Sequence, residues 1–189
     1  MIVRERRTYR FVEFVRDSLA LLVRLPLLVR ARLRRRVSHA FEEKLMLTVT
    51  AVNGCRYCAW FHEREAARTR VPPEEIRSLL SGAIDRPVGG GEASGLLFAQ
   101  HWARSGGRPE PEAVARLRQT YGGDVAGDIL LFLRLITLGN LAGNTFGAFL
   151  ERARGPRAGA PGLWDELLVF LATVPLFGPI GWAMRRAGR

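Results

Sequence analysis

Apolar residues recur at helical spacing near the start of the chain. They are Phe11, Val12, Phe14, Val15, Leu19, Leu22 and Val23. Charged residues fall between them, and this pattern predicts an amphipathic helix. Pro26 has no backbone donor, so the helix should kink or restart there. Residues 1–37 are therefore expected to form a helical arm.

A second stretch, residues 42–52, is apolar on most faces and predicts another helix. Asn53-Gly54 follows it, and glycine is the usual residue that ends a helix in left-handed geometry. A new helix should then begin at the cysteines that come next. No segment alternates apolar and polar residues as a half-buried strand does. The chain is therefore expected to be all-α.

Proline and glycine divide the rest of the chain. Further helices are expected over residues 72–81, 92–103, 110–121 and 124–151, with a loop at 85–91 and a linker at 154–162. With 189 residues, of which 48% are apolar, the chain suits one domain with a real core. The expected parts are a basic arm at 1–37, a helical domain at 38–153, the linker, and an apolar segment at 163–189.

The helix expected at 124–151 contains a glycine repeat. Gly139, Gly143 and Gly147 lie four residues apart, so one face of this helix carries no side chains and another helix can approach it closely. Asn140 and Asn144 lie within the repeat and are expected to cap or cross-link neighbouring helices. The repeat therefore predicts an interior helix of a bundle.

The last apolar segment, residues 167–184, has eighteen uncharged residues and is followed by two arginines. This length just reaches that of a membrane-spanning helix. Its two prolines and two glycines argue against a regular span and favour a re-entrant, interfacial or core-packed segment. Trp164 and Trp182, near its ends, are of a residue type that anchors at lipid interfaces.

Charge distinguishes the two ends from the middle of the chain. The net charge is +11, and residues 1–36 contain eleven arginines against three acidic residues. Such an arm can pack on its own domain with a solvated basic face, lie on an anionic membrane surface, or pack against a neighbouring subunit. No nucleic-acid-binding motif accompanies it, and its acidic residues interrupt any run resembling a signal peptide.

The two cysteines of the chain lie together as Cys55-Arg56-Tyr57-Cys58, and His62 follows one turn later. In a helix, Cys55, Cys58 and His62 would project from one face. Thiols at this spacing can close a disulfide without large backbone movement. His62 is placed to take or return a proton, and the start of a helix favours a thiolate. The pattern predicts a redox site.

Two other interpretations of these residues stay open at this point. Free cysteines are commonly buried and inert small hydrophobes. Cys55, Cys58 and His62 are also good zinc ligands, and Glu43 or His39 would have to supply the fourth. Structural zinc sites usually draw on two separated ligand pairs, and the chain has no second pair.

Two acidic residues precede the dithiol. If Ser38 or His39 begins the helix, Glu43 lies one turn inside it and can face the following helix. Glu42 is expected to be a solvated residue of the first turn that complements the helix dipole. His39 and His101 are interpreted as ordinary surface or core histidines rather than catalysts.

The run from Glu43 to His62 carries a family resemblance. A glutamate twelve residues before the first cysteine, followed by C-x-x-C-x-x-x-H, resembles the alkylhydroperoxidase D (AhpD-like) branch of the carboxymuconolactone decarboxylase superfamily. Residues 136–146 are also similar to that superfamily, so the resemblance covers about residues 38–153. It implies an all-α AhpD-like bundle, here with the basic arm and the apolar C-terminal segment added.

The resemblance also implies roles for these residues. Cys58 would attack a hydroperoxide and become a sulfenic acid, and Cys55 would condense with it to a disulfide. His62 and Glu43 would move the protons. Tyr57 stands where well-studied members carry a histidine, and a phenol is a poor base at neutral pH although it can donate a hydrogen bond. An external thiol or disulfide reductant and a homo-oligomer, a trimer or a multiple of trimers, are expected as partners.

The function expected is that of a thiol-dependent peroxidase or disulfide oxidoreductase in the cytoplasm, with a membrane surface as a further partner. No cofactor or metal is expected, because the chain has no P-loop, dinucleotide fingerprint or paired metal-binding histidines. Nucleic acid is not expected as a partner. The alternative is a non-catalytic oligomeric or membrane-associated interaction protein with a vestigial dithiol. Lactone decarboxylation is disfavoured because that branch of the superfamily does not depend on a dithiol.

Overall fold

The computed structural model describes residues 6–83, 91–152 and 162–188. These residues form eight α-helices and contain no strand, which confirms the predicted all-α class. The helices are α1 (Phe11–Val23), α2 (Leu25–Arg34), α3 (His39–Asn53), α4 (Arg56–Arg68), α5 (Pro73–Ser81), α6 (Glu92–Arg104), α7 (Pro111–Arg152) and α8 (Leu163–Ala187). The loop expected at 85–91 and the linker expected at 154–162 fall almost entirely outside the described residues.

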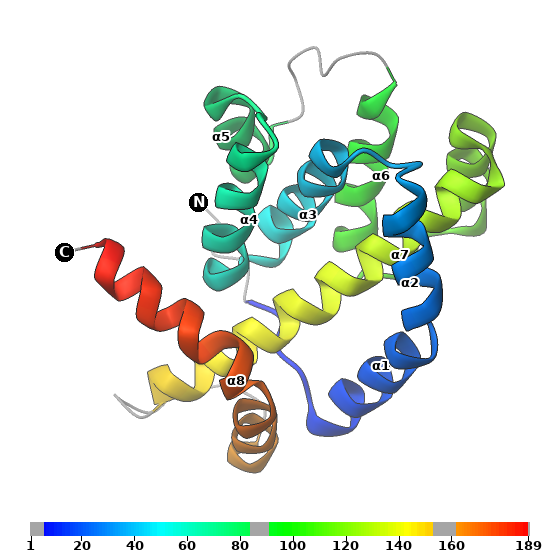
Figure 1. The fold of residues 1–189 in the computed structure, drawn as a ribbon. Coiled ribbons are helices and arrows are strands. Elements are labelled where there is room, and N and C mark those ends of the chain that lie inside the picture. The colour runs from blue at the N-terminus through cyan, green and yellow to red at the C-terminus, as the bar shows by residue number, and fades with distance from the viewer. Residues whose placement is uncertain (1–5, 84–90, 153–161, 189) are drawn as a thin grey trace.

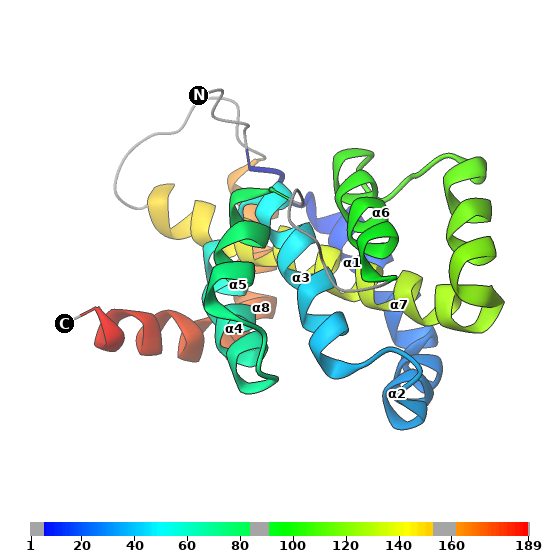
Figure 2. The same cartoon turned by 90° about the horizontal axis from the view of Figure 1, so that it is seen from above.

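The centre of the fold is α3, which packs against α4, α5, α6 and α7. Its buried residues lie on most of its faces, as the apolar stretch predicted, and Leu45, Leu47 and Val49 are completely inaccessible to solvent. Figure 2 shows α4 and α5 on one side of α3 and α6 on the other. The helix that carries the predicted proton-transfer glutamate is thus surrounded by the rest of the bundle.

The long helix α7 crosses the whole molecule (Figure 1). Gly122 interrupts it with a non-helical backbone (φ 76°, ψ 160°), so that it consists of two helices joined at a kink. The sequence predicted this break between residues 121 and 124. Beyond the kink, α7 packs against α3 and α4 and provides the surface on which α1, α2 and α8 lie.

The N-terminal arm follows α7 as two short helices (Figure 1). Arg24 separates α1 from α2, and Pro26 lies in the first turn of α2, so the predicted restart is confirmed. Arg36 anchors the end of the arm, because its guanidinium binds both carboxylate oxygens of Asp128 on α7 at 2.8 and 3.0 Å. The arm is therefore attached to the bundle by a bidentate ion pair.

The apolar face of the arm is only partly covered. Phe11 and Phe14 pack against the core, but no residue of α1 is fully buried. Val12, Leu22 and Val23 are more than half exposed. A solvated basic face alone does not describe this helix, because it also presents apolar side chains to solvent.

The C-terminal segment forms one continuous helix, α8, although it contains Pro175 and Pro179. The prolines and glycines that argued against a regular span do not end the helix, which instead changes direction partway along (Figure 1). A proline within a helix removes one hydrogen bond and bends the axis without ending the helix when neighbouring contacts support it. Here α7, α4 and α1 supply those contacts.

Two described helices, α7 and α8, are long and apolar enough to cross a membrane. In α7 half of the apolar window is buried inside the fold, as in the core helix of a soluble protein. In α8 only 17% of the window is buried, and Trp164 is 74% exposed. Length and composition alone are weak evidence for a membrane span, but of these two helices α8 leaves more of its apolar window exposed.

Candidate active site

The two cysteines lie at the junction of α3 and α4. Gly54 ends α3 in left-handed geometry at φ 70°, which confirms the predicted boundary. Cys55 is the N-cap of α4, and its Sγ accepts a hydrogen bond from the backbone N–H of Cys58 at 3.3 Å. Both cysteines are reduced, and they are 1% and 6% exposed. Cys55 therefore takes the place that a serine or aspartate usually fills at a helix start.

The position of Cys55 gives the two thiols opposite acidities. Burial raises the pKa of Cys55, but hydrogen bonds from the Cys58 thiol and from the N–H groups of Cys58 and Tyr57, with the charge of Arg6, lower it by more, so it ends below its ordinary value. Burial raises the pKa of Cys58 well above its ordinary value, and its bond to Cys55 raises it further. In the reduced protein, Cys55 is therefore the more acidic of the two thiols.

Glu43 and His62 form a second pair beside the dithiol. The Nδ1 atom of His62 lies 2.7 Å from Oε2 of Glu43, and the two side chains are 14% and 2% exposed. Glu43 comes from the second turn of α3 and faces α4, as expected from a helix beginning at Ser38, whose hydroxyl accepts from the N–H of Phe41. A carboxylate on Nδ1 fixes the imidazole so that Nε2 is left to accept a proton.

Cys58 and His62 are one turn apart on α4 and therefore lie on the same side of it. Among the described residues, no hydrogen bond joins the Cys55–Cys58 pair to the Glu43–His62 pair. The structure thus brings together two internally bonded pairs, with Cys58 and His62 on neighbouring turns of α4 and Glu43 on α3.

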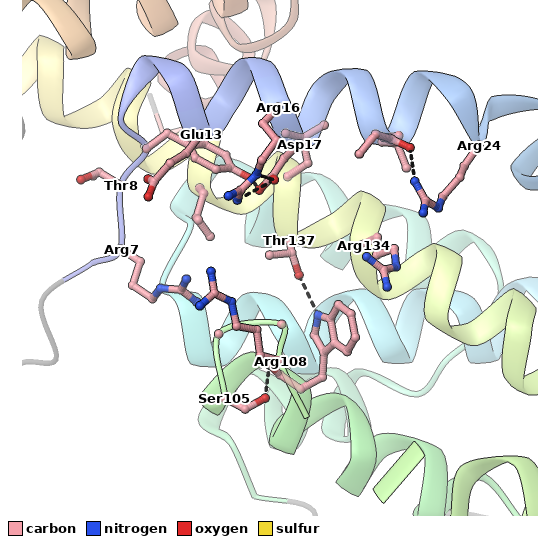
Figure 3. Close-up of a pocket in the computed structure, with 18 residues that line it drawn as sticks. Arg7, Thr8, Glu13, Arg16, Asp17, Arg24, Ser105, Arg108, Arg134 and Thr137 are labelled. Carbon is pink, nitrogen blue, oxygen red and sulfur yellow. Dashed lines mark hydrogen bonds and ion pairs between the residues drawn. The ribbon is translucent and has the colours of Figure 1, made fainter. Parts of the chain in front are cut away.

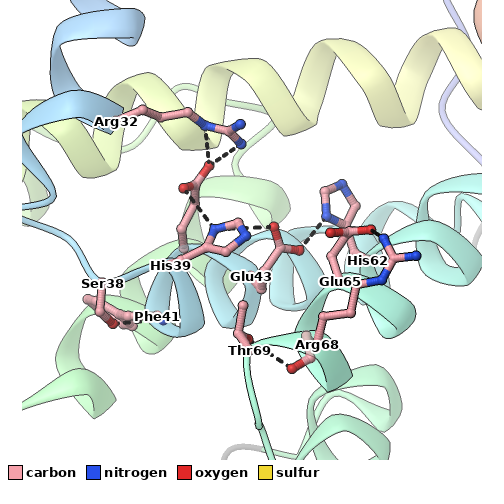
Figure 4. A network of polar contacts seen from close by, with 11 residues as sticks. Arg32, Ser38, His39, Phe41, Glu43, His62, Glu65, Arg68 and Thr69 are labelled. Atoms are coloured by element: carbon pink, nitrogen blue, oxygen red, sulfur yellow. Dashed lines mark hydrogen bonds and ion pairs between the residues drawn. The ribbon is translucent and has the colours of Figure 1, made fainter.

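A network of ionic contacts surrounds Glu43 (Figure 4). His39 lies with Nδ1 3.5 Å from Glu42 and 4.0 Å from Glu43, and its side chain is half exposed. Glu42 accepts two hydrogen bonds from Arg32, at 2.6 and 3.1 Å. The expectation that Glu42 is a solvated residue is wrong, because the guanidinium from α2 covers it and leaves it 3% exposed.

Tyr57 points away from the Glu43–His62 pair. Its ring makes edge and tilted contacts with Phe146 and Phe177, at centroid distances of 5.4 and 5.8 Å, and its hydroxyl accepts from Arg56 at 2.8 Å. It is 4% exposed. In the place of the family histidine, this chain therefore has a side chain that packs α4 against α7 and α8.

The glycine repeat of α7 makes room for this junction. A Cβ on Gly143 would lie 2.7 Å from Sγ of Cys55 and 3.0 Å from the ring of Phe177, and one on Gly147 would lie 3.4 Å from Tyr57. The close approach predicted for this face is confirmed at these two positions. A Cβ on Gly139 would have no atom within 4 Å, so Gly139 takes no part in this close approach.

Asn144 connects the junction to the N-terminal segment. Its Nδ2 donates to the carbonyl of Asn53 at 2.9 Å, at the end of α3, and to that of Arg7 at 3.1 Å. Asn140 accepts from Thr50 at 3.0 Å. The predicted cross-linking role of both asparagines is confirmed.

The sequence did not single out Phe177 or Arg6 as neighbours of the dithiol. Phe177 comes from α8 and lies over Gly143, beside Cys55, while the aliphatic part of Arg6 lies 3.6 Å from where a Cβ on Gly54 would be. Both come from segments far from the cysteines in the chain, so no local pattern could have placed them there. The glycine repeat was the one available signal that something packs against α7 at this point.

The described residues do not form the group of ligands that the zinc interpretation requires. Within residues 6–83, 91–152 and 162–188, no three or more His, Cys, Asp and Glu side chains are grouped so that they could hold a metal ion. Glu43, the candidate fourth ligand, is instead bonded to His62.

Comparison with known proteins gives one match. Residues 17–100 match the family described as carboxymuconolactone decarboxylase family. The comparisons with curated proteins and with solved structures found no match. The matched segment begins in α1 and ends in α6, and it includes Glu43, both cysteines and His62. Over this segment the chain is similar to the carboxymuconolactone decarboxylase family, which includes the AhpD-like proteins, as the dithiol segment led us to expect.

Proposed function

We propose that the chain is a thiol-dependent peroxidase or disulfide oxidoreductase that works through the Cys55/Cys58 couple. The observation that supports this most is the Glu43–His62 pair, because His62 lies one turn beyond Cys58 on the helix that Cys55 caps. An inert pair of buried cysteines has no need of a carboxylate-oriented imidazole beside it. Such a pair is the usual means of moving a proton to or from a nucleophile.

Cys58 must lose its proton before its sulfur can attack a peroxide. The family resemblance assigns attack on the peroxide to Cys58, and the raised pKa of Cys58 means that attack requires a base. His62, oriented by Glu43, takes that proton on Nε2. The Cys58 thiolate then attacks the outer oxygen of a hydroperoxide, the S–O bond forms as the O–O bond breaks, and the alkoxide leaves with the proton from His62 as an alcohol.

The Cys55 thiolate completes the cycle. It attacks the sulfur of the Cys58 sulfenic acid, an S–S bond forms, and the hydroxyl leaves with a proton as water. The lowered pKa of Cys55 suits this step because it favours the thiolate, which is the attacking species. An external dithiol then reduces the disulfide by two successive exchanges and is itself oxidised.

Rapid-mixing oxidation by an organic hydroperoxide tests this proposal. Wild type should form the intramolecular disulfide, Cys55→Ser should stop at a sulfenic acid that a dimedone reagent captures, and Cys58→Ser should not react above the rate of an ordinary thiol. Glu43→Gln should slow the first step, and Glu63→Gln, at an exposed position of α4, is the matched control. Equal rates in wild type and both cysteine variants would refute the peroxidase.

A second candidate function, association with an anionic membrane surface, follows from exposed apolar residues beside arginines. They are Val12, Leu19, Leu22, Val23, Leu25, Leu27, Val29 and Leu33 on the arm, and Leu163, Trp164, Leu171, Leu176 and Trp182 on α8. Such a surface binds lipid through apolar insertion and attraction to acidic headgroups.

Co-sedimentation with vesicles separates the membrane from a second copy of the chain. The full chain should sediment with phosphatidylserine vesicles and less with phosphatidylcholine vesicles. Replacing Leu22 and Trp164 by Asp should abolish this, whereas Arg118→Gln, on an exposed part of α7, should not. A homo-oligomer in light scattering that the same double variant dissociates, without vesicle binding, would assign these faces to subunit contacts.

A further inference from the structure

A hollow lies away from the dithiol, between the N-terminal segment, α1, the loop after α6, and α7 (Figure 3). Its volume is about 550 Å³, within the range of pockets that hold small ligands. Five arginines line it, from all four of these parts of the chain: Arg7, Arg16, Arg24, Arg108 and Arg134. Apolar side chains, among them Leu21, Trp102, Leu138 and Leu141, form another part of its wall.

The acidic residues of the hollow neutralise few of these charges. Asp17 accepts from the hydroxyl of Tyr9 at 3.0 Å and from Nε of Arg16 at 2.9 Å. Glu13 accepts only a long bond, 3.4 Å, from the backbone N–H of Arg10. Asp17 thus balances Arg16, and the other arginines of the hollow lack a comparable partner.

Arg134, on α7, is one of the arginines of the hollow without a carboxylate partner among the described residues. No carboxylate in the described part of the chain forms an ion pair with it, and its guanidinium lies 5.5 Å from the ring centre of Trp102. Partial burial, followed by the nearby charge of Arg24, lowers the pKa of Arg134. Figure 3 shows its side chain reaching into the hollow from α7.

Arg7 and Arg24 are held in place around it. The guanidinium of Arg7 lies against the loop after α6, 3.2 Å from where a Cβ on Gly106 would be, and the carbonyl of Arg7 is fixed by Asn144. Arg24 donates to the carbonyl of Ala20 at 2.7 Å. Neither these two nor Arg108 has an ion pair among the described residues.

Elsewhere in this protein, arginines at helix junctions have carboxylate partners, as in the pairs Arg32–Glu42 and Arg36–Asp128. Four guanidinium groups gathered at one hollow without such partners repel one another, and an anion would relieve that repulsion. The planar fork of arginine matches the oxygens of a carboxylate or a phosphate. The apolar wall beside it suits a ligand with a hydrocarbon or aromatic body.

We propose that this hollow is a binding site for a small organic anion, with a carboxylate or phosphate head bound by Arg134, Arg7 and Arg108 and an apolar body lying against Trp102 and Leu138. The site is separate from the dithiol, and its occupancy does not depend on the proposed peroxidase function.

Titration of the full chain with octanoate, octyl phosphate, inorganic phosphate and octanol tests this site. The indole N–H of Trp102 donates to Thr137, which also lines the hollow, so its resonance in an NMR spectrum of the ¹⁵N-labelled protein reports on ligand there. Octanoate or octyl phosphate should shift that resonance saturably, and octanol should not. Whichever of the two binds more tightly identifies the head group, and tight binding of phosphate alone would overturn the role of the apolar wall.

Arg134→Gln should weaken binding of the better ligand at least tenfold, and Arg108→Gln should weaken it as well. Arg118→Gln, an exposed arginine outside the hollow, is the matched control and should bind as wild type does. Cys58→Ser should also bind normally, which keeps this result independent of the redox chemistry. Equal affinity in Arg134→Gln and Arg118→Gln, or equal binding of octanol and octanoate, would overturn the proposal.

Discussion

Gly143→Ala tests the close contact between α7 and the dithiol. The added methyl would lie 2.7 Å from Sγ of Cys55 and about 3 Å from the ring of Phe177, distances at which something must shift. Cys55 cannot move freely, because its sulfur caps α4 through the N–H of Cys58. Gly139→Ala is the matched control, since it lies one turn earlier on the same helix with nothing within 4 Å.

Both substitutions replace a helical glycine with alanine, which stabilises the folded state, but only Gly143→Ala also overpacks a filled site. Replacing a helical glycine with alanine stabilises by about 0.4 to 1 kcal/mol where the backbone allows it, so Gly139→Ala should raise the free energy of unfolding by that amount. Overpacking a filled site costs about 1 to 3 kcal/mol. Gly143→Ala should therefore be about 1 to 3 kcal/mol less stable than Gly139→Ala.

Urea unfolding followed by circular dichroism, with both thiols kept reduced, measures this difference. The slope of the transition should match in the two variants, so that the midpoints report stability. If Gly143→Ala is as stable as Gly139→Ala, the sulfur does not lie against the α7 backbone in solution, and the packing described for Cys55 is wrong.

Four further predictions follow from the site. Thiolate absorbance should show one thiol titrating below the ordinary pKa and one well above it, and in Cys58→Ala the Cys55 titration should move to higher pH because the side-chain donor is lost; two ordinary titrations would contradict this. Because the folded-state pKa of Cys55 is lowered, this thiol favours the folded state as pH rises above its ordinary pKa and loses that contribution as pH falls through the lowered value. Glu43→Gln should reduce peroxide reactivity at least tenfold at neutral pH while both thiols are retained, measured by rapid mixing; an unchanged rate would remove the carboxylate from the mechanism. Phe177→Ala should cost about 3 to 5 kcal/mol in urea unfolding and should speed alkylation of Cys55, because the ring lies beside the sulfur. Asn144→Ala removes donors to two carbonyl groups and should cost about 1 to 3 kcal/mol, with faster hydrogen exchange in the N-terminal segment; no change in either would contradict the cross-link.

Local patterns predicted the helix boundaries well. Gly54 was expected to end a helix because only a residue without a side chain takes a positive φ at no cost, and it does so at φ 70°. The break near Gly122 and the restart at Pro26 follow from the same kind of backbone preference. These features depend on a residue and its immediate neighbours, which a sequence displays directly.

Long-range contacts explain where prediction failed. Glu42 has the position of a solvated first-turn residue, but Arg32 arrives from another helix and buries it. Helix α8 continues through two prolines because neighbouring helices support it. In both cases a partner distant in the chain outweighs the local preference, and one sequence does not show which partner that will be.

The dithiol itself shows how these two levels combine. Its spacing and the histidine one turn later predict chemistry, but they treat the two cysteines as equivalent members of one helical face. The structure separates them, because the helix begins between them: Cys55 accepts the first N–H groups of α4 as its cap, and Cys58 lies inside the helix with its own N–H already donated. The hydrogen bond from the N–H of Cys58 gives a partner to a backbone donor that the helix itself leaves unpaired. The same bond stabilises negative charge on Cys55 alone. A base for Cys58 is then needed before it can attack a peroxide, and His62, oriented by Glu43 from α3, lies on the turn of α4 that follows it.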